Sequence, residues 1–208
     1  PNVIKIGRRL ALMVFNASRF VLMQLDRIGE SAYSVGPEAI REPLDLAFIE
    51  RMRRTIVRST ESMDQIDLAA GLTAIEELFW QFCDDYLELV KIRSYLEEDV
   101  PARRSAIATL RLALETFLRL LAPYLPFVTE EVWSWRFAEN GGARSVHLAA
   151  WPSVQESEEV PRSEDLAFVC AVDVLQQIRS AKTRAKKSLR WPVVSLRVEG
   201  PEASRAAL

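Results

Sequence analysis

The sequence predicts a mostly α-helical fold: a helical bundle followed by the start of a small α/β subdomain. Apolar residues recur every three or four positions over five long stretches, and this spacing corresponds to one face of a helix. Glycines and prolines lie mainly between these stretches, where they favour turns and helix ends. A single run typical of a β-strand, VVSLRVEGP, follows at residues 193–201. A lone strand cannot complete its hydrogen bonds, so either its partner lies beyond Leu208 or the strand is not formed.

The helices can be placed in order along the chain. The first is predicted at residues 2–25, and the next residues, 29–43, are rich in Gly, Ser and Pro and predict a loop. Further helices are predicted at residues 44–65, 72–97, 103–122 and 163–189, with a short one ending near Phe137. We expect Thr129 to be the N-cap of the short helix. The helix at 72–97 is apolar around most of its circumference, so we expect it at the centre of the bundle.

Two segments lie between the short helix and the last one. Residues 145–152 are expected to be extended, and residues 155–165 are strongly acidic. The acidic segment is the best candidate for a domain boundary. We therefore expect a helical-bundle domain at residues 1–153 and a C-terminal unit, consisting of a helix and a strand, at residues 163–208.

Composition limits the possible functions. The chain has 208 residues, of which 49% are hydrophobic and 27% charged, as in ordinary soluble globular proteins. A net charge of −2 gives no overall attraction to nucleic acid, so binding would need local clusters. Cys83 and Cys170 are isolated, which is typical of a reducing compartment. Without an apolar leader or a membrane-length apolar run, we expect a cytoplasmic protein. A first residue Pro1 followed at once by a helix suggests part of a longer chain.

The first predicted helix has a basic face opposite its apolar stripe. At about 100° per residue, five polar side chains fall together on that face, and they are Lys5, Arg8, Arg9, Asn16 and Arg19. Phe20 lies at the border between the two faces. Cations that hold phosphates, an amide that reads base edges and an aromatic ring that stacks on bases make a workable surface for single-stranded RNA. From these residues alone, the alternative of a solvated face on an ordinary amphipathic helix is favoured.

A second basic cluster lies at the end of the last predicted helix. From Arg179 to Arg190 the chain has six cations and no acid, and three of them, Arg179, Lys182 and Lys186, are our candidates for RNA phosphate contacts. A solvated helix end explains the same pattern equally well.

Residues for covalent chemistry are few. His147 is the only histidine, which excludes a metal site built on paired histidines, and no Gly-rich phosphate loop is present. Neither cysteine has a basic neighbour in sequence that would favour a thiolate nucleophile. Adjacent acids such as Asp84 and Asp85 do not share a helix face, so paired acid–base work is not expected from them. We expect no catalytic residue and no metal ligand in this chain.

Four segments together resemble the C-terminal region of valyl-tRNA synthetases, a family of class I aminoacyl-tRNA synthetases. They are KIGRRLALMVFNASRFVL (5–22), FWQFCDDYLELVKIRSY (79–95), LRLLAPYLPFVTEEVW (118–133) and HLAAWP (147–152). The third segment is similar to one shared with the isoleucine and leucine enzymes. The strings NASRF and FCDDYLEL narrow the resemblance to the valine enzymes. Given this likeness, an RNA-binding face on the first helix is now favoured over a solvated face.

The resemblance implies that the first helix contacts the anticodon. By this likeness Phe20 would stack on a splayed anticodon base, Asn16 would bond a base edge, and Arg19 would pair with phosphate or stack. Many members of the family have lysine where this chain has Met13, and Arg9, one turn earlier, is the candidate substitute. Lys5 and Arg8 would contact phosphates.

The resemblance also implies the parent activity. The parent enzyme would use ATP and Mg²⁺ to attach valine to its tRNA, while this region, with no cofactor of its own, would bind the anticodon arm. The motifs HxGH and KMSKS, which carry adenylation in class I enzymes, are absent here. The expected partners are the tRNA(Val) anticodon arm and the catalytic domain of the same chain, in a monomer and without a membrane. The alternatives are the same domain of an isoleucyl or leucyl enzyme, and a non-enzymatic helical interaction module.

Overall fold

Helix α6 (Pro101–Leu121) forms the centre of the bundle. The computed structural model describes residues 2–29, 35–98, 100–138 and 143–206, and in it α6 contacts α1, α3, α4, α5 and α7. Its buried side chains point in all directions around the axis, as expected for a helix enclosed by others. We had expected the helix at 72–97 in this place, but that stretch forms several elements at the side of α6.

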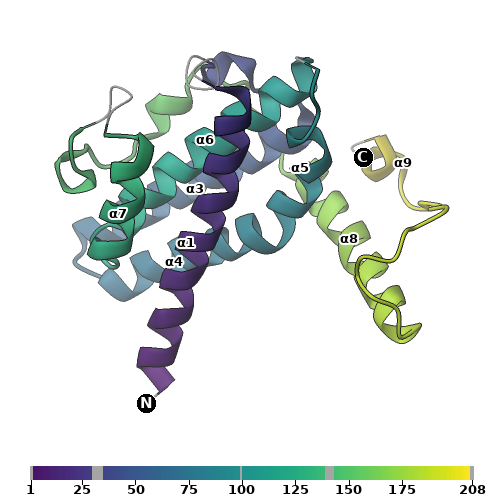
Figure 1. Cartoon of the computed structure of the whole chain (residues 1–208), viewed down its shortest axis with the longest axis horizontal. Helices are drawn as coiled ribbons and strands as arrows, with labels where there is room; N and C mark the ends of the chain where they lie inside the picture. The colour runs from purple at the N-terminus through teal and green to yellow at the C-terminus, as the bar shows by residue number, and fades with distance from the viewer. Residues whose placement is uncertain (1, 30–34, 99, 139–142, 207–208) are drawn as a thin grey trace.

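The other helices of the bundle surround α6 (Figure 1). They are α1 (Asn2–Ile28), α3 (Pro43–Asp64), α4 (Leu68–Gln81), α5 (Leu87–Ser94) and α7 (Pro126–Arg136). A π-helical turn, η2 (Phe82–Tyr86), joins α4 to α5, and the short 3₁₀ turns within the described ranges are η1 (Pro37–Ala39), η3 (Val146–Leu148) and η4 (Val154–Ser157). The helical bundle predicted from the sequence is thus confirmed. None of the described helices is long and apolar enough to cross a membrane.

Prolines begin three of these helices. Pro43, Pro101 and Pro126 each occupy the first helical position, where the missing N–H has no intrahelical partner to lose. The sequence predicts these helices to start after their prolines, so their observed starts lie earlier. Thr129 is therefore not an N-cap; it lies inside α7, is fully buried, and donates its hydroxyl to the Leu125 carbonyl at 2.9 Å.

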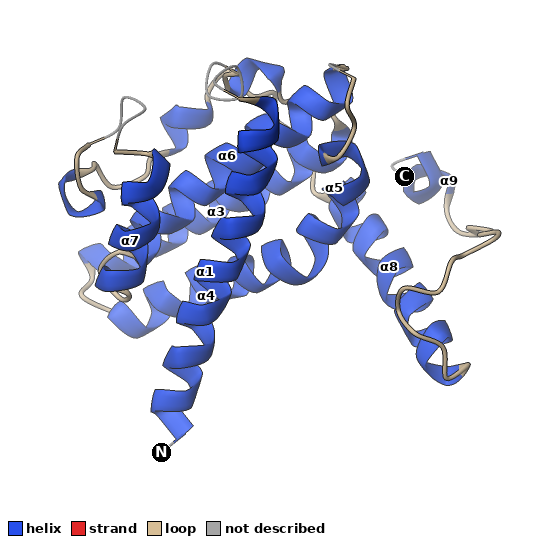
Figure 2. Cartoon of the chain, in the orientation of Figure 1, coloured by secondary structure: helices blue, strands red, loops and turns tan. Residues whose placement is uncertain are grey.

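The last part of the chain contains helices and loops. Helix α8 (Leu166–Arg184) starts against α3 and then projects from the bundle, and residues 185–201 lead to the short helix α9 (Glu202–Ala206). The strand predicted at 193–201 is wrong: the described part of the chain contains no strand (Figure 2). The segment has no neighbouring strand to pair with, and Val194 is 97% exposed.

A buried carboxylate joins three helices. Asp45, in the first turn of α3, is completely buried and accepts hydrogen bonds from Tyr86 at 2.8 Å and Ser105 at 2.6 Å. The Arg93 guanidinium of α5 binds both of its oxygens, at 2.7 and 2.9 Å. Burial, and then the Asp45 charge, raise the pKa of Tyr86, so its hydroxyl remains a donor. The carboxylate therefore has a partner on each oxygen, as a buried charge requires.

Two buried arginines hold the segment after η3 on the bundle. Arg53 of α3 donates to the side chain and carbonyl of Ser157 and to the Val160 carbonyl. Arg119 of α6 pairs with Glu156 at 2.9 Å and through a second, shorter contact. Burial acts to raise the pKa of Glu156, but the Arg119 guanidinium outweighs it and leaves that pKa below its ordinary value.

Replacing Asp45 with Asn should strongly destabilise the protein. The change keeps the shape but leaves the Arg93 guanidinium without its counter-ion, and breaking a buried pair typically costs about 3–5 kcal/mol. Glu77→Gln is the control, because Glu77 pairs with Arg58 at the surface with both side chains more than half exposed, where a pair is worth about 0–1 kcal/mol. Urea unfolding followed by circular dichroism measures both. Equal losses in the two variants would contradict the role of Asp45.

The Glu156 pair should make stability depend on pH. A carboxylate whose folded pKa lies below its ordinary value of 4.5 stabilises the fold above that pH. This contribution is lost as the pH falls through the lower, folded pKa. The difference in unfolding free energy between the native chain and Glu156→Gln should therefore be largest above pH 4.5 and shrink in acid. A difference that stays constant over this pH range would rule out the proposed coupling.

Candidate nucleic-acid interface

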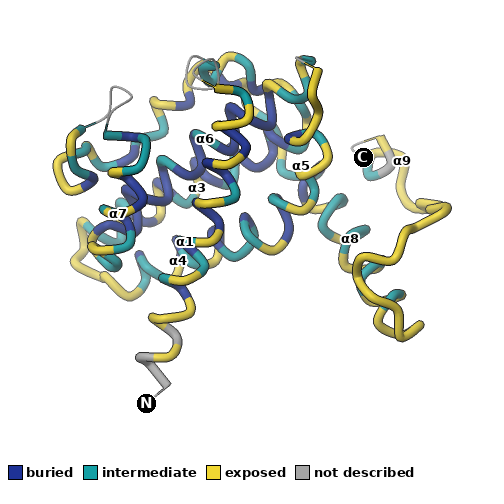
Figure 3. The backbone as a smooth tube through the Cα atoms, viewed as in Figure 1, coloured by how far each residue is buried: buried dark blue, intermediate teal, exposed yellow. Residues whose placement is uncertain are grey.

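Helix α1 presents the polar face that its sequence predicts. Leu10, Val14, Ala17, Val21 and Leu25 are buried at steps of three and four residues. The side chains on the opposite side are exposed, namely Lys5, Arg8, Arg9, Asn16 and Arg19. Figure 3 shows this alternation along α1, with burial increasing once the helix reaches the bundle. The apolar stripe thus fixes the helix on α6 and turns its cationic face outward.

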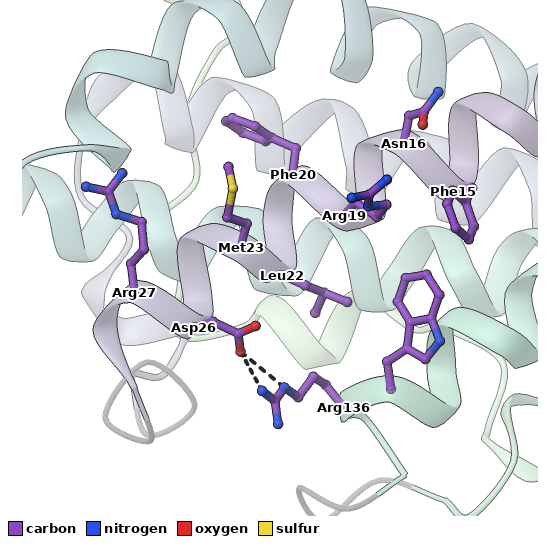
Figure 4. A pocket seen from close by; sticks show the side chains of 10 residues that line it. Phe15, Asn16, Arg19, Phe20, Leu22, Met23, Asp26, Arg27 and Arg136 are labelled. Carbon is purple, nitrogen blue, oxygen red and sulfur yellow. Dashed lines mark hydrogen bonds and ion pairs between the residues drawn. The ribbon is translucent and has the colours of Figure 1, made fainter.

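An open groove of about 1080 Å³ lies between α1 and α7 (Figure 4). Both helices pack on α6 and on each other, which forms the two sides. Its lining residues are Phe15, Asn16, Arg19, Phe20, Leu22, Met23, Asp26, Arg27, Trp135 and Arg136. The structure therefore brings three predicted site residues, Asn16, Arg19 and Phe20, to one concave surface.

These three residues have different surroundings. Asn16 is exposed, with its amide turned outward. Phe20 is half-buried and meets the Tyr95 ring at 6.3 Å between centroids and an interplanar angle of 70°. The Arg19 guanidinium lies 6.0 Å from the centre of the Phe15 ring. In the view of Figure 4, Phe20 and Phe15 lie on opposite sides of Arg19.

The remaining cations predicted on α1 lie outside this groove. The Arg9 guanidinium stacks 4.8 Å from the centre of the Trp80 ring of α4. Arg8, the residue before Arg9, and Lys5, about one turn nearer the start of the helix, are both exposed. Arg9 and Asn16 are seven residues apart, which is roughly 10 Å along the axis, so the face continues from the groove toward these cations.

The groove includes residues that the sequence analysis missed. The Arg27 guanidinium stacks 4.8 Å from the centre of the Tyr95 ring, and Asp26 accepts from Arg136 at 2.9 and 3.1 Å. Arg27 could have been found by extending the exposed face of α1 two turns beyond Arg19. Trp135 and Arg136 could not, because they join the groove only through the packing of α7 on α1.

The charge of the groove is positive. Arg19, Arg27 and Arg136 line it together with one carboxylate, Asp26. The Asp26–Arg136 pair is exposed on both sides, 48% and 42%, and such pairs hold weakly against competing charges. Guanidinium groups bind phosphate and stack on rings, so this lining can accommodate a nucleic-acid strand.

The second predicted cluster has a different organisation. Arg179 of α8 donates to the Asp85 carboxylate at 3.1 Å and to the Asp84 carbonyl at 2.6 Å. Lys182 donates to the Leu189 carbonyl at 2.8 Å. Lys186 is exposed and has a left-handed backbone, with φ at 52°. Arg179 and Lys182 are thus engaged in holding α8 and its end, whereas Lys186 extends into solvent.

The described residues offer little for covalent chemistry. Cys83 and Cys170 are both reduced. Burial, and then the charge of Asp84, raise the pKa of the Cys83 thiol, which disfavours its nucleophilic form. No group of three or more His, Cys, Asp or Glu residues in the described ranges is arranged to hold a metal ion.

Known proteins are similar to almost all of this chain. Residues 45–199 match the family described as the anticodon-binding domain of tRNA ligase. Valine–tRNA ligases from Salinispora tropica, Thermobifida fusca and Bifidobacterium longum are 45%, 42% and 40% identical to it, each over 98% of the chain. The chain covers 24%, 22% and 24% of these proteins respectively, about a quarter of their length. The likeness to these relatives includes α1, which precedes the family match.

Proposed function

Because the chain belongs to the family of anticodon-binding domains of tRNA ligases, we propose that it binds the anticodon arm in a valine–tRNA ligase. The names of its relatives favour valine over the isoleucine and leucine enzymes. The observation that carries the proposal is the groove that gathers Asn16, Arg19 and Phe20 on one cationic surface. A helical module without an RNA role would not need this combination of an exposed amide, guanidinium groups and an aromatic ring.

Each of the three residues has a task in this proposal. Phe20 stacks on an unstacked anticodon base, and the Tyr95 contact limits the movement of its ring, which lowers the entropy lost on binding. Asn16 offers both a donor and an acceptor to a base edge. Arg19 holds a phosphate or stacks on a base as a flat cation. Arg9, already stacked on Trp80, extends the contact along α1.

Phosphates of the arm supply the remaining contacts in this proposal. Lys5 and Arg8 reach them from the first turns of α1, and Arg179, Lys182 and Lys186 from the end of α8. We rank Lys186 first in the second group, since Arg179 and Lys182 already have protein partners.

The chemistry of the ligase belongs to other parts of the polypeptide in this proposal. The catalytic domain of the same chain would use ATP and Mg²⁺ to activate valine and transfer it to tRNA(Val). No step of that reaction is assigned to the residues that the structure describes. We also propose a monomeric, cytoplasmic enzyme, in which residues 1–153 form the anticodon-binding bundle and residues 163–208 begin a separate subdomain.

Substitutions in the groove should remove discrimination between anticodons. Asn16→Ala should weaken binding of a valine tRNA anticodon stem-loop by about 1–3 kcal/mol, the usual value of a base-edge pair. Phe20→Ala should cost roughly the same through lost stacking. Calorimetry on this loop, and on one with its central anticodon base changed, measures affinity and selectivity.

The control for these variants is Phe127→Ala. Phe127 is 90% exposed at the start of α7 and does not line the groove, so its removal should leave both affinities unchanged. If neither loop binds the native chain at low salt, or if both bind equally and the groove variants change nothing, the proposed anticodon reading is incorrect.

Phosphate contacts should appear in the salt dependence of binding. Each neutralised phosphate of a single strand contributes a slope of about −0.7 to log K against log salt. Lys186→Ala should therefore reduce the slope by roughly that amount, equally for the matched and the altered loop. Arg58→Ala is the control, since Arg58 is exposed on α3 and pairs with Glu77. An unchanged slope for Lys186→Ala would remove the end of α8 from the RNA-binding surface.

A further inference from the structure

The exposed ridge of α1 has aromatic side chains on two flanks. Toward α5, Phe20 and Arg27 meet Tyr95. Toward α7, Phe15 meets Trp135, with ring centroids 5.2 Å apart and an interplanar angle of 80°. The anticodon contacts proposed above use Asn16, Arg19 and Phe20 and no residue of α7, so the aromatic surface on the α7 flank has no assigned role.

Trp135 differs from its neighbour Trp133 by helix geometry. Two residues along a helix differ by about 200°, so the two indoles leave α7 on opposite sides. Trp133 is 1% exposed and donates its N–H to the Ala143 carbonyl. Trp135 is half-buried and lines the groove. Part of the Trp135 side chain packs against the core, while the same residue also lines the groove.

The Trp135 ring is held in place before any ligand binds. Its indole N–H donates to the Glu131 carboxylate one turn earlier, at 3.1 Å, and the Phe15 ring supports it from α1. A side chain already fixed in its binding orientation loses little entropy when it stacks on a ligand.

Cations lie beside this ring. Arg136, the next residue, is held toward the groove by Asp26, and Arg19 reaches the same flank over the Phe15 ring. Each nucleotide within a strand is flanked by two backbone phosphates, so a stacking ring with adjacent guanidinium groups matches the layout of a nucleotide. Because the Asp26–Arg136 pair is exposed, a phosphate can replace Asp26 as a partner of Arg136 at little cost.

We propose that Trp135 is a second base-stacking platform, so that the surface lined by Phe20, Arg19 and Trp135 holds two unstacked bases of one RNA loop, one at Phe20 and one at Trp135. This inference rests on the proposed function, since it assumes an anticodon loop as the ligand. Stacking tolerates every base, so Trp135 adds affinity, while selectivity between anticodons remains with Asn16 and the α5 flank.

The test uses the whole chain and a valine tRNA anticodon stem-loop, intact or with a single abasic site at each loop position in turn. Trp135→Leu keeps an apolar side chain against the bundle but removes the stacking face, and it should weaken the intact loop by about fivefold or more. Trp135→Phe, which keeps a ring, should recover most of the loss. With the loop that lacks the base stacked on Trp135, Trp135→Leu should no longer lower the affinity. With a loop that lacks a different base, Phe20→Ala should no longer lower it.

A second readout is tryptophan fluorescence. Binding of the intact loop should quench the tryptophan fluorescence of the native chain. The part of this quenching that comes from Trp135 should be missing in Trp135→Phe, which retains the other four tryptophans.

The outcomes separate the two proposals. If Phe20→Ala weakens binding and Trp135→Leu, folded by circular dichroism, does not, the second platform is overturned and the anticodon-binding function stands. If Trp135→Leu weakens every abasic loop equally, the residue acts through the shape of the groove and stacking is overturned. If the native chain binds no loop, the proposed function fails, and this inference fails with it.

Discussion

The buried carboxylate of Asp45 is the constraint on which the arrangement of helices depends. A completely buried charge persists only if each oxygen has a partner, and here the partners come from η2, α5 and α6. The ion pair with Arg93 fixes the end of α5, and two residues later Tyr95 provides the ring that meets both Phe20 and Arg27. One flank of the groove is therefore positioned from the core.

The π-helical turn extends this control to the other end of the chain. Its consecutive residues Asp85 and Tyr86 are both buried but serve different helices. Tyr86 donates to Asp45, and Asp85 accepts from Gln176 and Arg179 of α8. An added residue in a helical turn changes which side chains face inward, so one local irregularity lets adjacent polar groups reach partners on separate elements. The position of α8 is in this way coupled to the same network.

Sequence periodicity predicts the helices well because each helix that packs on α6 needs an apolar stripe at helical spacing. The same periodicity predicts which face of α1 carries Asn16 and Arg19. It fails where the outcome depends on another element. The predicted strand at 193–201 lacks a neighbour to pair with, and the contact of Glu156 with Arg119 of α6 has no signal in the acidic stretch itself. In the sequence, prolines indicate helix breaks, but Pro126 begins α7. Thr129 therefore lies inside this helix and is not its N-cap. The sequence favours a packing role for Trp135 and assigns none to Arg136, because no pattern within one helix reveals which residues a second helix will bring beside it.

The position of acids explains how a chain of net charge −2 can still attract RNA. Helix α1 has no acid before Asp26, and that carboxylate is bound to Arg136 from the opposite side of the groove. Exposed charges farther away than about 10 Å are largely screened at 0.1 M salt, so distant acids contribute little to the local potential, and the nearby Glu131 carboxylate is bonded to the Trp135 indole. Asp26 also helps to hold the Arg136 guanidinium at the groove, through contacts of 2.9 and 3.1 Å. A single acid among three arginines thus orders the cationic surface while leaving it attractive to phosphate.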